Sequence, residues 1–131
     1  MASIVELRDM SDDEIREMME NAREEMFNLR FQNASARLED VSRIKSVRRE
    51  IAQLQTVLHM RQLAIQEAAK SPEVAEALAG KKWSAEATFS YEDSLWVVSF
   101  VDEDGDDLVE GRVNLNKKKN RSRKARQVAR R

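Results

Sequence analysis

Two stretches of helical periodicity constrain this chain more than any other feature. Apolar residues recur along residues 11–36 and again along residues 41–69 at the spacing of one helix face. The first stripe is Ile15, Met18, Met19, Ala22, Met26 and Leu29, and the second is Ile44, Val47, Ile51, Leu54, Leu58 and Ile65. Because a short connector within residues 34–41 joins them, the pattern predicts a long antiparallel two-helix hairpin. With three Gly and one Pro in 131 residues, the chain has too few turn residues for an all-β fold.

The first helix carries a second apolar stripe, and this stripe needs a neighbour of its own. Its members follow helical offsets on another face of the helix: Phe27, Phe31, Ala34 and Leu38. The neighbour is either the N-terminal arm, which contains Ile4 and Leu7, or a separate molecule. The residues themselves leave both alternatives open.

The periodicity changes after residue 70. Ser71 and Pro72 predict the start of a short helix that ends near Gly80. Residues 83–91, 95–101 and 108–115 have strand character and predict a small three-stranded antiparallel meander, with Gly111 as a candidate bulge. We therefore expect a mainly α fold: the hairpin in residues 1–70, the short helix plus meander in 71–115, and a basic disordered tail in 116–131.

Charge is strongly segregated, although the formal net charge is only −1. Residues 71–111 contain 11 acidic and 2 basic residues, whereas residues 112–131 contain 10 basic residues and no acidic one. Such a tail cannot bury a core, and it suits a polyanion because each phosphate contact releases counterions. The alternative is a solubilising tail that binds nothing. The acidic meander should face solvent or a basic neighbouring protein.

Few residues in the chain are suited to catalysis or to metal binding. Cysteine is absent, and His59 is the only histidine, so thiolate chemistry, Cys-ligated zinc and paired histidine ligands are excluded. The acidic residues around Gly105 lack the spacing of a calcium loop and predict a hairpin turn. We expect no catalytic residue, no metal site and no cofactor. No apolar run is long enough to span a membrane, and we expect no membrane partner.

The predicted outer face of the second helix combines short side chains with cations. Opposite its apolar stripe lie Lys45, Arg49, Ala52 and Thr56, and no acidic residue shares this face. Arg43 and Arg48 flank the stripe. Short side chains let a backbone approach a phosphate, to which Arg can donate two hydrogen bonds. The pattern favours RNA binding over an ordinary solvated face, on which acidic and basic residues would alternate.

Several segments of residues 1–65 match a known family in sequence and spacing. They read ELR at 6–8, SDDE at 11–14, EMFNLRFQ at 25–32, SRI at 42–44, VRREIA at 47–52 and TVL at 56–58. On these segments the chain resembles the bacterial large-ribosomal-subunit protein twenty-nine family. The resemblance implies a small helical hairpin with a structural role on the large subunit of the cytoplasmic ribosome. It implies binding to large-subunit rRNA near the nascent-chain exit, beside neighbouring ribosomal proteins, with chaperones or targeting factors docking nearby.

The resemblance also suggests site residues by their positions in the matching segments. As RNA contacts it implies Asn28, Arg30, Gln32, Arg48, Arg49 and Thr56, to which the helix-face argument adds Arg43 and Lys45. Phe27 and Phe31 would form an interface with rRNA or a ribosomal neighbour. From its charge alone, the tail is expected to lie along rRNA through Lys117, Lys118, Lys119, Arg121, Arg123, Lys124 and Arg126.

Two departures from the family pattern limit what the resemblance explains. The family usually has a Gly in the connector and a Pro near the start of the second helix, and neither is present here. Residues 71–131 lie outside the resemblance altogether. The rival hypothesis is an interaction protein unrelated to ribosomes, in which the hairpin pairs with other helices and the basic tail binds nucleic acid.

Overall fold

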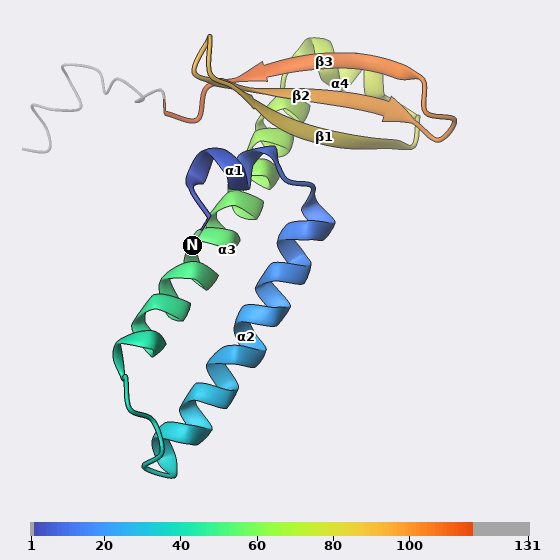
Figure 1. The fold of residues 1–131 in the computed structure, drawn as a ribbon. Helices are drawn as coiled ribbons and strands as arrows, with labels where there is room; N and C mark the ends of the chain where they lie inside the picture. The colour runs from blue at the N-terminus through green and yellow to red at the C-terminus, as the bar shows by residue number, and fades with distance from the viewer. Residues whose placement is uncertain (1, 117–131) are drawn as a thin grey trace, which may run out of the picture.

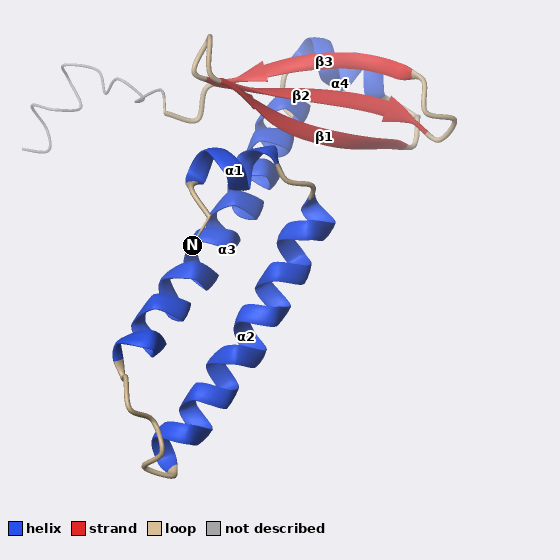
Figure 2. Ribbon diagram, viewed as in Figure 1, coloured by secondary structure: helices blue, strands red, loops and turns tan. Residues whose placement is uncertain are grey.

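The computed structural model describes residues 2–116, and the basic residues predicted to contact rRNA from position 117 onward lie outside this range. Four helices precede three strands (Figures 1 and 2). In chain order they are α1 (Ile4–Asp9), α2 (Asp12–Ala34), α3 (Ser42–Ala69), α4 (Pro72–Leu78), β1 (Trp83–Ser90), β2 (Leu95–Asp102) and β3 (Asp107–Val113). Helices α2 and α3 lie side by side, and the sheet lies near the end of α3 that is remote from the connector.

The prediction of a mainly α fold is wrong. Three strands of eight, eight and seven residues form a substantial sheet with its own hydrophobic core, so the chain has an α+β architecture. The N-terminal arm is also helical and forms α1, which begins with a capping box between Ser3 and Glu6. The helical periodicity of the longest segments predicts the wrong class. Short strands can be stabilised by packing on a helix, and a periodicity pattern does not show that packing.

The first stripe of α2 packs against α3 in two apolar clusters. Near the connector the buried residues are Ala22, Met26, Leu29 and Val47; nearer the sheet they are Leu7, Ile15, Leu54 and Val57. Leu7 belongs to α1, so the arm covers the first stripe and does not cover the second. Ser11 caps the start of α2 with a capping box, in which Glu14 Oε2 accepts from the Ser11 backbone N–H at 2.8 Å. The hydrogen bonds from the backbone and hydroxyl of Ser11 lower the pKa of Glu14.

The connector makes its turn without the usual glycine. Ala36 adopts a left-handed backbone with φ of 55°, and the Arg37 N–H donates to the carbonyl oxygen of Gln32 at 2.9 Å. An alanine in this conformation carries a steric cost that glycine avoids. At the start of α3, Asp40 Oδ1 accepts from the Ser42 backbone N–H at 2.9 Å and from the Ser42 hydroxyl. The hydroxyl and backbone hydrogen bonds from Ser42 lower the pKa of Asp40.

The antiparallel sheet has the order β1-β2-β3 and packs one face on α3 and α4. The buried residues of this second core are Ala64, Ala68, Val74, Leu78, Ala87, Trp96, Val98 and Phe100. Ala64 and Ala68 belong to α3, so the same helix contributes to the hairpin and to the sheet. Whether residues 1–70 and 71–115 behave as separate domains stays a prediction.

Gly111 is not the bulge that the sequence suggested. The irregularity lies between Phe100 and Val101, whereas Gly111 pairs regularly with Val98. Gly111 instead marks a close approach of the sheet to α3, because a Cβ there would lie 3.1 Å from the Cβ of Ala68. A small residue at each position lets strand β3 pack directly on the helix.

Candidate nucleic-acid interface

The outer face of α3 presents three cations to solvent. Lys45, Arg48 and Arg49 are all exposed, and none of them forms an ion pair within residues 2–116. Successive residues of a helix are rotated by 100°, so Lys45 and Arg49 lie opposite the buried Val47. Arg48 directly follows Val47 and lies on the flank beside this face. Because their charges are uncompensated in this part of the chain, the three side chains can donate to phosphate oxygens without breaking an existing pair.

Thr56 lies on the same outer face, but part of its hydrogen-bonding capacity is already used. Its hydroxyl donates to the carbonyl oxygen of Ala52 at 2.7 Å. The oxygen remains free to accept, which suits a ribose 2′-hydroxyl better than a phosphate. Ala52 lies between Thr56 and Arg49 on this face, and its short side chain does not project beyond them.

Arg43 does not join the outer face. Its guanidinium points toward α2, where Nη2 lies 2.6 Å and Nε 2.7 Å from Oε1 of Glu25. This ion pair links the two helices of the hairpin near the connector, and both side chains remain partly exposed. Arg43 can therefore contact RNA only through the part of its guanidinium that Glu25 leaves free.

The three candidates on α2 are exposed but do not form one patch. Asn28 and Gln32 are four residues apart and share one flank of the helix. Arg30 is two residues from each, which rotates it by about 200° to the other flank. The structure therefore brings Asn28 and Gln32 together and separates them from Arg30.

Phe27 and Phe31 form an exposed aromatic pair on α2. Their side chains are 70% and 66% exposed, and their spacing of four residues places them on the same face. No residue in 2–116 covers them, which is unusual for large aromatic side chains in a folded domain. This pair is the part of the second stripe that still needs a neighbour.

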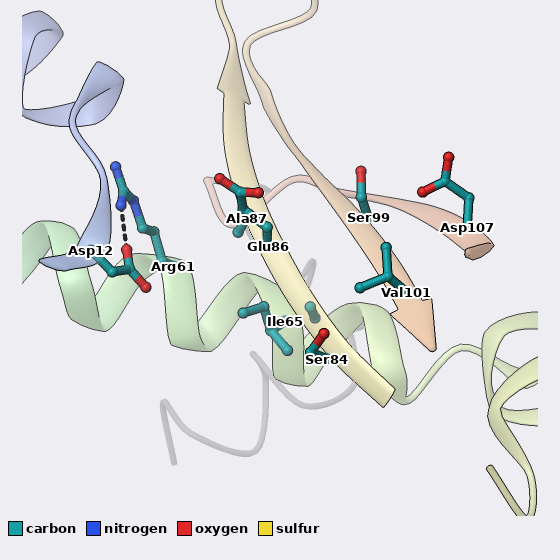
Figure 3. Close-up of a pocket in the computed structure, with 10 residues that line it drawn as sticks. Asp12, Arg61, Ile65, Ser84, Glu86, Ala87, Ser99, Val101 and Asp107 are labelled. Atoms are coloured by element: carbon teal, nitrogen blue, oxygen red, sulfur yellow. Dashed lines mark hydrogen bonds and ion pairs between the residues drawn. The ribbon is translucent and has the colours of Figure 1, made fainter. Parts of the chain in front are cut away.

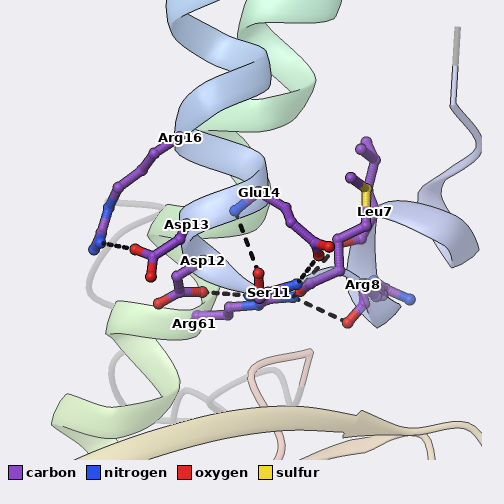
Figure 4. Close-up of polar contacts among 9 residues, drawn as sticks. Leu7, Arg8, Ser11, Asp12, Asp13, Glu14, Arg16 and Arg61 are labelled. Atoms are coloured by element: carbon purple, nitrogen blue, oxygen red, sulfur yellow. Dashed lines mark hydrogen bonds and ion pairs between the residues drawn. The ribbon is translucent and has the colours of Figure 1, made fainter.

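Arg61 is a structural residue that the sequence reasoning missed. Its side chain is only 8% exposed and forms an ion pair with Asp12 (Figure 4). It also donates to three carbonyl oxygens at the end of α1: Leu7 at 3.4 Å, Arg8 at 3.0 Å and Met10 at 2.6 Å. The sequence contains a signal that Arg61 is buried. Arg61 continues the apolar stripe of α3, at a spacing of four residues from Val57 and three from Ala64.

A second cation joins α1 to the sheet. The guanidinium carbon of Arg8 lies 4.1 Å from the ring centroid of Phe89 and 5.8 Å from those of Tyr91 and Trp96. Such cation–π contacts stabilise by about 0.5–2 kcal/mol depending on exposure. Arg61 therefore connects α1 with α2 and α3, and Arg8 connects α1 with the sheet, so α1 contacts both the hairpin and the extension.

The described part of the chain lacks two other functional features. Across residues 2–116, no group of three or more His, Cys, Asp or Glu side chains is arranged to hold a metal ion. Within the same range, none of the helices is both long enough and apolar enough to cross a membrane.

Comparison with known proteins places the first half of the chain among ribosomal proteins. The family model described as "Ribosomal L29 protein" matches residues 5–61. The large ribosomal subunit protein uL29 of Streptomyces griseus subsp. griseus is 46% identical over 61 residues, covering 47% of this chain and 82% of the relative. The protein of the same name from Saccharopolyspora erythraea is 44% identical over 71 residues, covering 54% and 85%. That from Staphylococcus aureus is 47% identical over 58 residues, covering 44% and 84%.

Proposed function

Because this chain belongs to the ribosomal L29 protein family, we propose that it binds large-subunit rRNA near the nascent-chain exit through its helical hairpin. The family consists of structural proteins of the large ribosomal subunit, and it is not an enzyme family. Membership assigns the chain to the ribonucleoprotein machinery of translation, in the cytoplasm.

The observation that carries RNA binding is the uncompensated outer face of α3. Lys45, Arg48 and Arg49 lie within the part of the chain that matches the family. Lys45 and Arg49 project from the outer face, and Arg48 projects from the flank beside it. The proposal assigns phosphate contacts to these three side chains and a ribose contact to Thr56. The exposed residues Asn28, Arg30 and Gln32 and the free part of Arg43 extend the RNA-binding surface around the hairpin.

Phe27 and Phe31 support a protein or RNA neighbour on α2. Burying two aromatic side chains that are about two-thirds exposed would stabilise the complex by about 1.5–3 kcal/mol for each ring that becomes fully covered. A neighbouring ribosomal protein near the exit tunnel is the partner we propose for this pair. Nascent-chain chaperones and targeting factors are further candidate partners in that region.

We expect that replacing Lys45, Arg48 and Arg49 together with Gln reduces incorporation into large subunits. Without these three cations to bind phosphates, the affinity should fall by at least about tenfold at moderately high salt. A tagged full-length chain is sedimented from lysate through a sucrose gradient, and the fraction that migrates with the large subunit is measured.

The matched control replaces three basic residues outside the family match with Gln: Lys70, Lys81 and Lys82. This variant should sediment with the large subunit as the unmodified chain does. Equal reductions in both variants would show that net charge matters and the α3 face does not. If the unmodified chain stays at the top of the gradient and self-associates, the non-ribosomal helix-pairing hypothesis replaces this one.

The tail is proposed to add nonspecific contacts to rRNA phosphates. Replacing seven of the nine tail cations with Gln (Lys117, Lys118, Lys119, Arg121, Arg123, Lys124 and Arg126) should flatten the salt dependence of rRNA binding. The slope of log K against log salt concentration should change by about 0.7–0.9 for each phosphate that the tail no longer neutralises. Binding is measured by titration at several salt concentrations, and an unchanged slope would exclude the tail from the interface.

A further inference from the structure

One face of the sheet has no partner within residues 2–116. Helices α3 and α4 cover the other face, and strand alternation directs every second side chain away from them. We call this second surface the open face. It includes Ser84, Glu86, Thr88, Val97, Ser99, Val101, Asp107, Glu110 and Arg112.

The open face has an apolar centre with carboxylates on both sides. Val97 and Val101 of the central strand are half-buried and lie on either side of Ser99. Glu86 and Glu110 pair with Ser99 from the two neighbouring strands, and Asp107 pairs with Val101. None of these three carboxylates takes part in an ion pair within the described range.

The surface is also hollowed beside β1. A pocket at this edge is lined by the open-face residues Ser84, Glu86, Ser99, Val101 and Asp107. Toward the covered face its lining continues with Ala85, Ala87 and Ile65, and with the ion pair of Arg61 and Asp12 (Figure 3). Residues 83–113 contain 9 acidic residues and 1 basic residue, so the field around the pocket is strongly negative. An extended segment with several Lys or Arg residues fits this surface, because their aliphatic stems can cover the valines while their charges reach the carboxylates.

Such a segment begins at Lys117, shortly after β3 ends at Val113. Residues 117–131 contain 9 basic residues and no acidic one. Between β3 and this segment the chain makes a turn in which the Asn116 N–H donates to Asn114 Oδ1 at 3.0 Å. Fifteen extended residues span about 50 Å, whereas a strand of seven or eight residues is about 25 Å long. The segment is therefore long enough to run back across the whole open face.

We propose that the open face binds the chain's own basic tail, residues 117–131, when no RNA is present. Because the two parts are connected, their effective concentration is in the millimolar range even if each ion pair is weak. The contact holds the tail away from unspecific RNA until rRNA phosphates compete for its cations. This inference goes beyond RNA binding and is tested without RNA, so its failure would leave the proposed function standing.

A spin label on the tail tests the contact directly. The chain has no Cys, so Ser122→Cys in the full-length protein gives a single attachment site for a nitroxide. Paramagnetic loss of methyl NMR intensity is measured at about 20 mM and about 1 M salt, where the Debye lengths are roughly 20 Å and 3 Å. At low salt we expect the strongest loss at Val97 and Val101, a weaker loss at the covered Val98, and recovery of all three at high salt.

Two charge-matched variants of the spin-labelled protein distinguish binding of the tail to the open face from nonspecific electrostatic attraction between the tail and the rest of the chain. Glu86→Gln, Asp107→Asn and Glu110→Gln together should reduce the loss at Val97 and Val101 by at least half. The control replaces three exposed glutamates of α2 that form no ion pair within residues 2–116, using Glu17→Gln, Glu20→Gln and Glu24→Gln. The control should leave the intensity loss unchanged.

Other outcomes would overturn the proposal. Equal effects of the two triple variants would mean that the tail responds only to net charge. Absence of intensity loss on the open face at low salt would mean that the tail does not bind there. Spin-labelled protein without isotopes is also mixed with isotope-labelled protein without the spin label. Intensity loss in this mixture that matches the loss within one chain would assign the surface to the tail of a second copy.

Discussion

Replacing Arg61 with leucine is expected to lower the free energy of unfolding by about 3 kcal/mol, because buried acceptors lose a charged donor. The substitution leaves the carbonyl oxygens of Leu7, Arg8 and Met10 without this donor, and it removes the ion pair with Asp12. Leucine retains much of the apolar packing on α3, so the destabilisation measures the polar contribution of Arg61. Urea unfolding gives the total change, and amide hydrogen exchange should show that α1 loses protection first.

Arg43→Leu is the matched control for this experiment. Arg43 also forms an ion pair between elements, but its side chain is 53% exposed and its partner Glu25 is 38% exposed. An ion pair with that exposure contributes less than about 1 kcal/mol. Arg61→Lys should recover only part of the stability, because an ammonium cannot reproduce the planar geometry with which the guanidinium reaches four acceptors. Similar destabilisation by Arg61→Leu and Arg43→Leu would contradict the importance of burial.

Phe100→Ala is expected to destabilise the sheet by about 3–5 kcal/mol, because truncating a fully buried phenylalanine leaves a cavity. Phe100 is 0% exposed, lies at the centre of the sheet core and packs edge-to-face on Trp83 with ring centroids 5.2 Å apart. The cluster of Ile15, Leu54 and Val57 makes no use of Phe100. Hydrogen exchange should therefore show that β1–β3 lose protection while the middle of the hairpin keeps most of its own.

Val97→Ala provides the comparison on the same strand. Val97 is half-exposed on the open face, so its truncation should cost about 1 kcal/mol or less. The Phe100 experiment also tests the predicted division at residue 70. Loss of protection that spreads equally over α2, α3 and the strands would show that hairpin and extension unfold as one unit, despite their separate apolar clusters.

Most of the local structure could be predicted from neighbouring residues. The stripe beginning at Ile15 and the capping box at Ser11 specified where α2 starts and which face it buries. The alternation after Trp83 specified β1, and the turn residues after Ser90 and Asp102 separated the strands. These features depend on hydrogen bonds and side-chain periods within a few residues, which a sequence pattern records directly.

The importance of the sheet was harder to judge. The alternation predicts the strands, yet the two long helical segments predict a mainly α class. The sheet is stable in the structure because α3 continues beneath it and supplies Ala64 and Ala68 to its core. A helix stripe shows that one face is buried, but it does not identify which element covers each turn of the helix. Gly111, expected as a bulge, is a point of close packing on α3 for the same reason.

For the candidate RNA-binding residues, too, the sequence predicted some features and the tertiary structure decided the others. From the sequence alone, the period of 3.6 residues placed Lys45, Arg49 and Thr56 on one face, and their exposure agrees with that placement. Only the tertiary structure decided that Arg43 turns inward to Glu25, that α1 leaves Phe27 and Phe31 uncovered, and that Arg61 joins three helices. Arg61 is separated along the sequence by 49 to 54 residues from the residues that accept its hydrogen bonds. Local periodicity carries no information about such separations, because they depend on how completed helices and strands pack together.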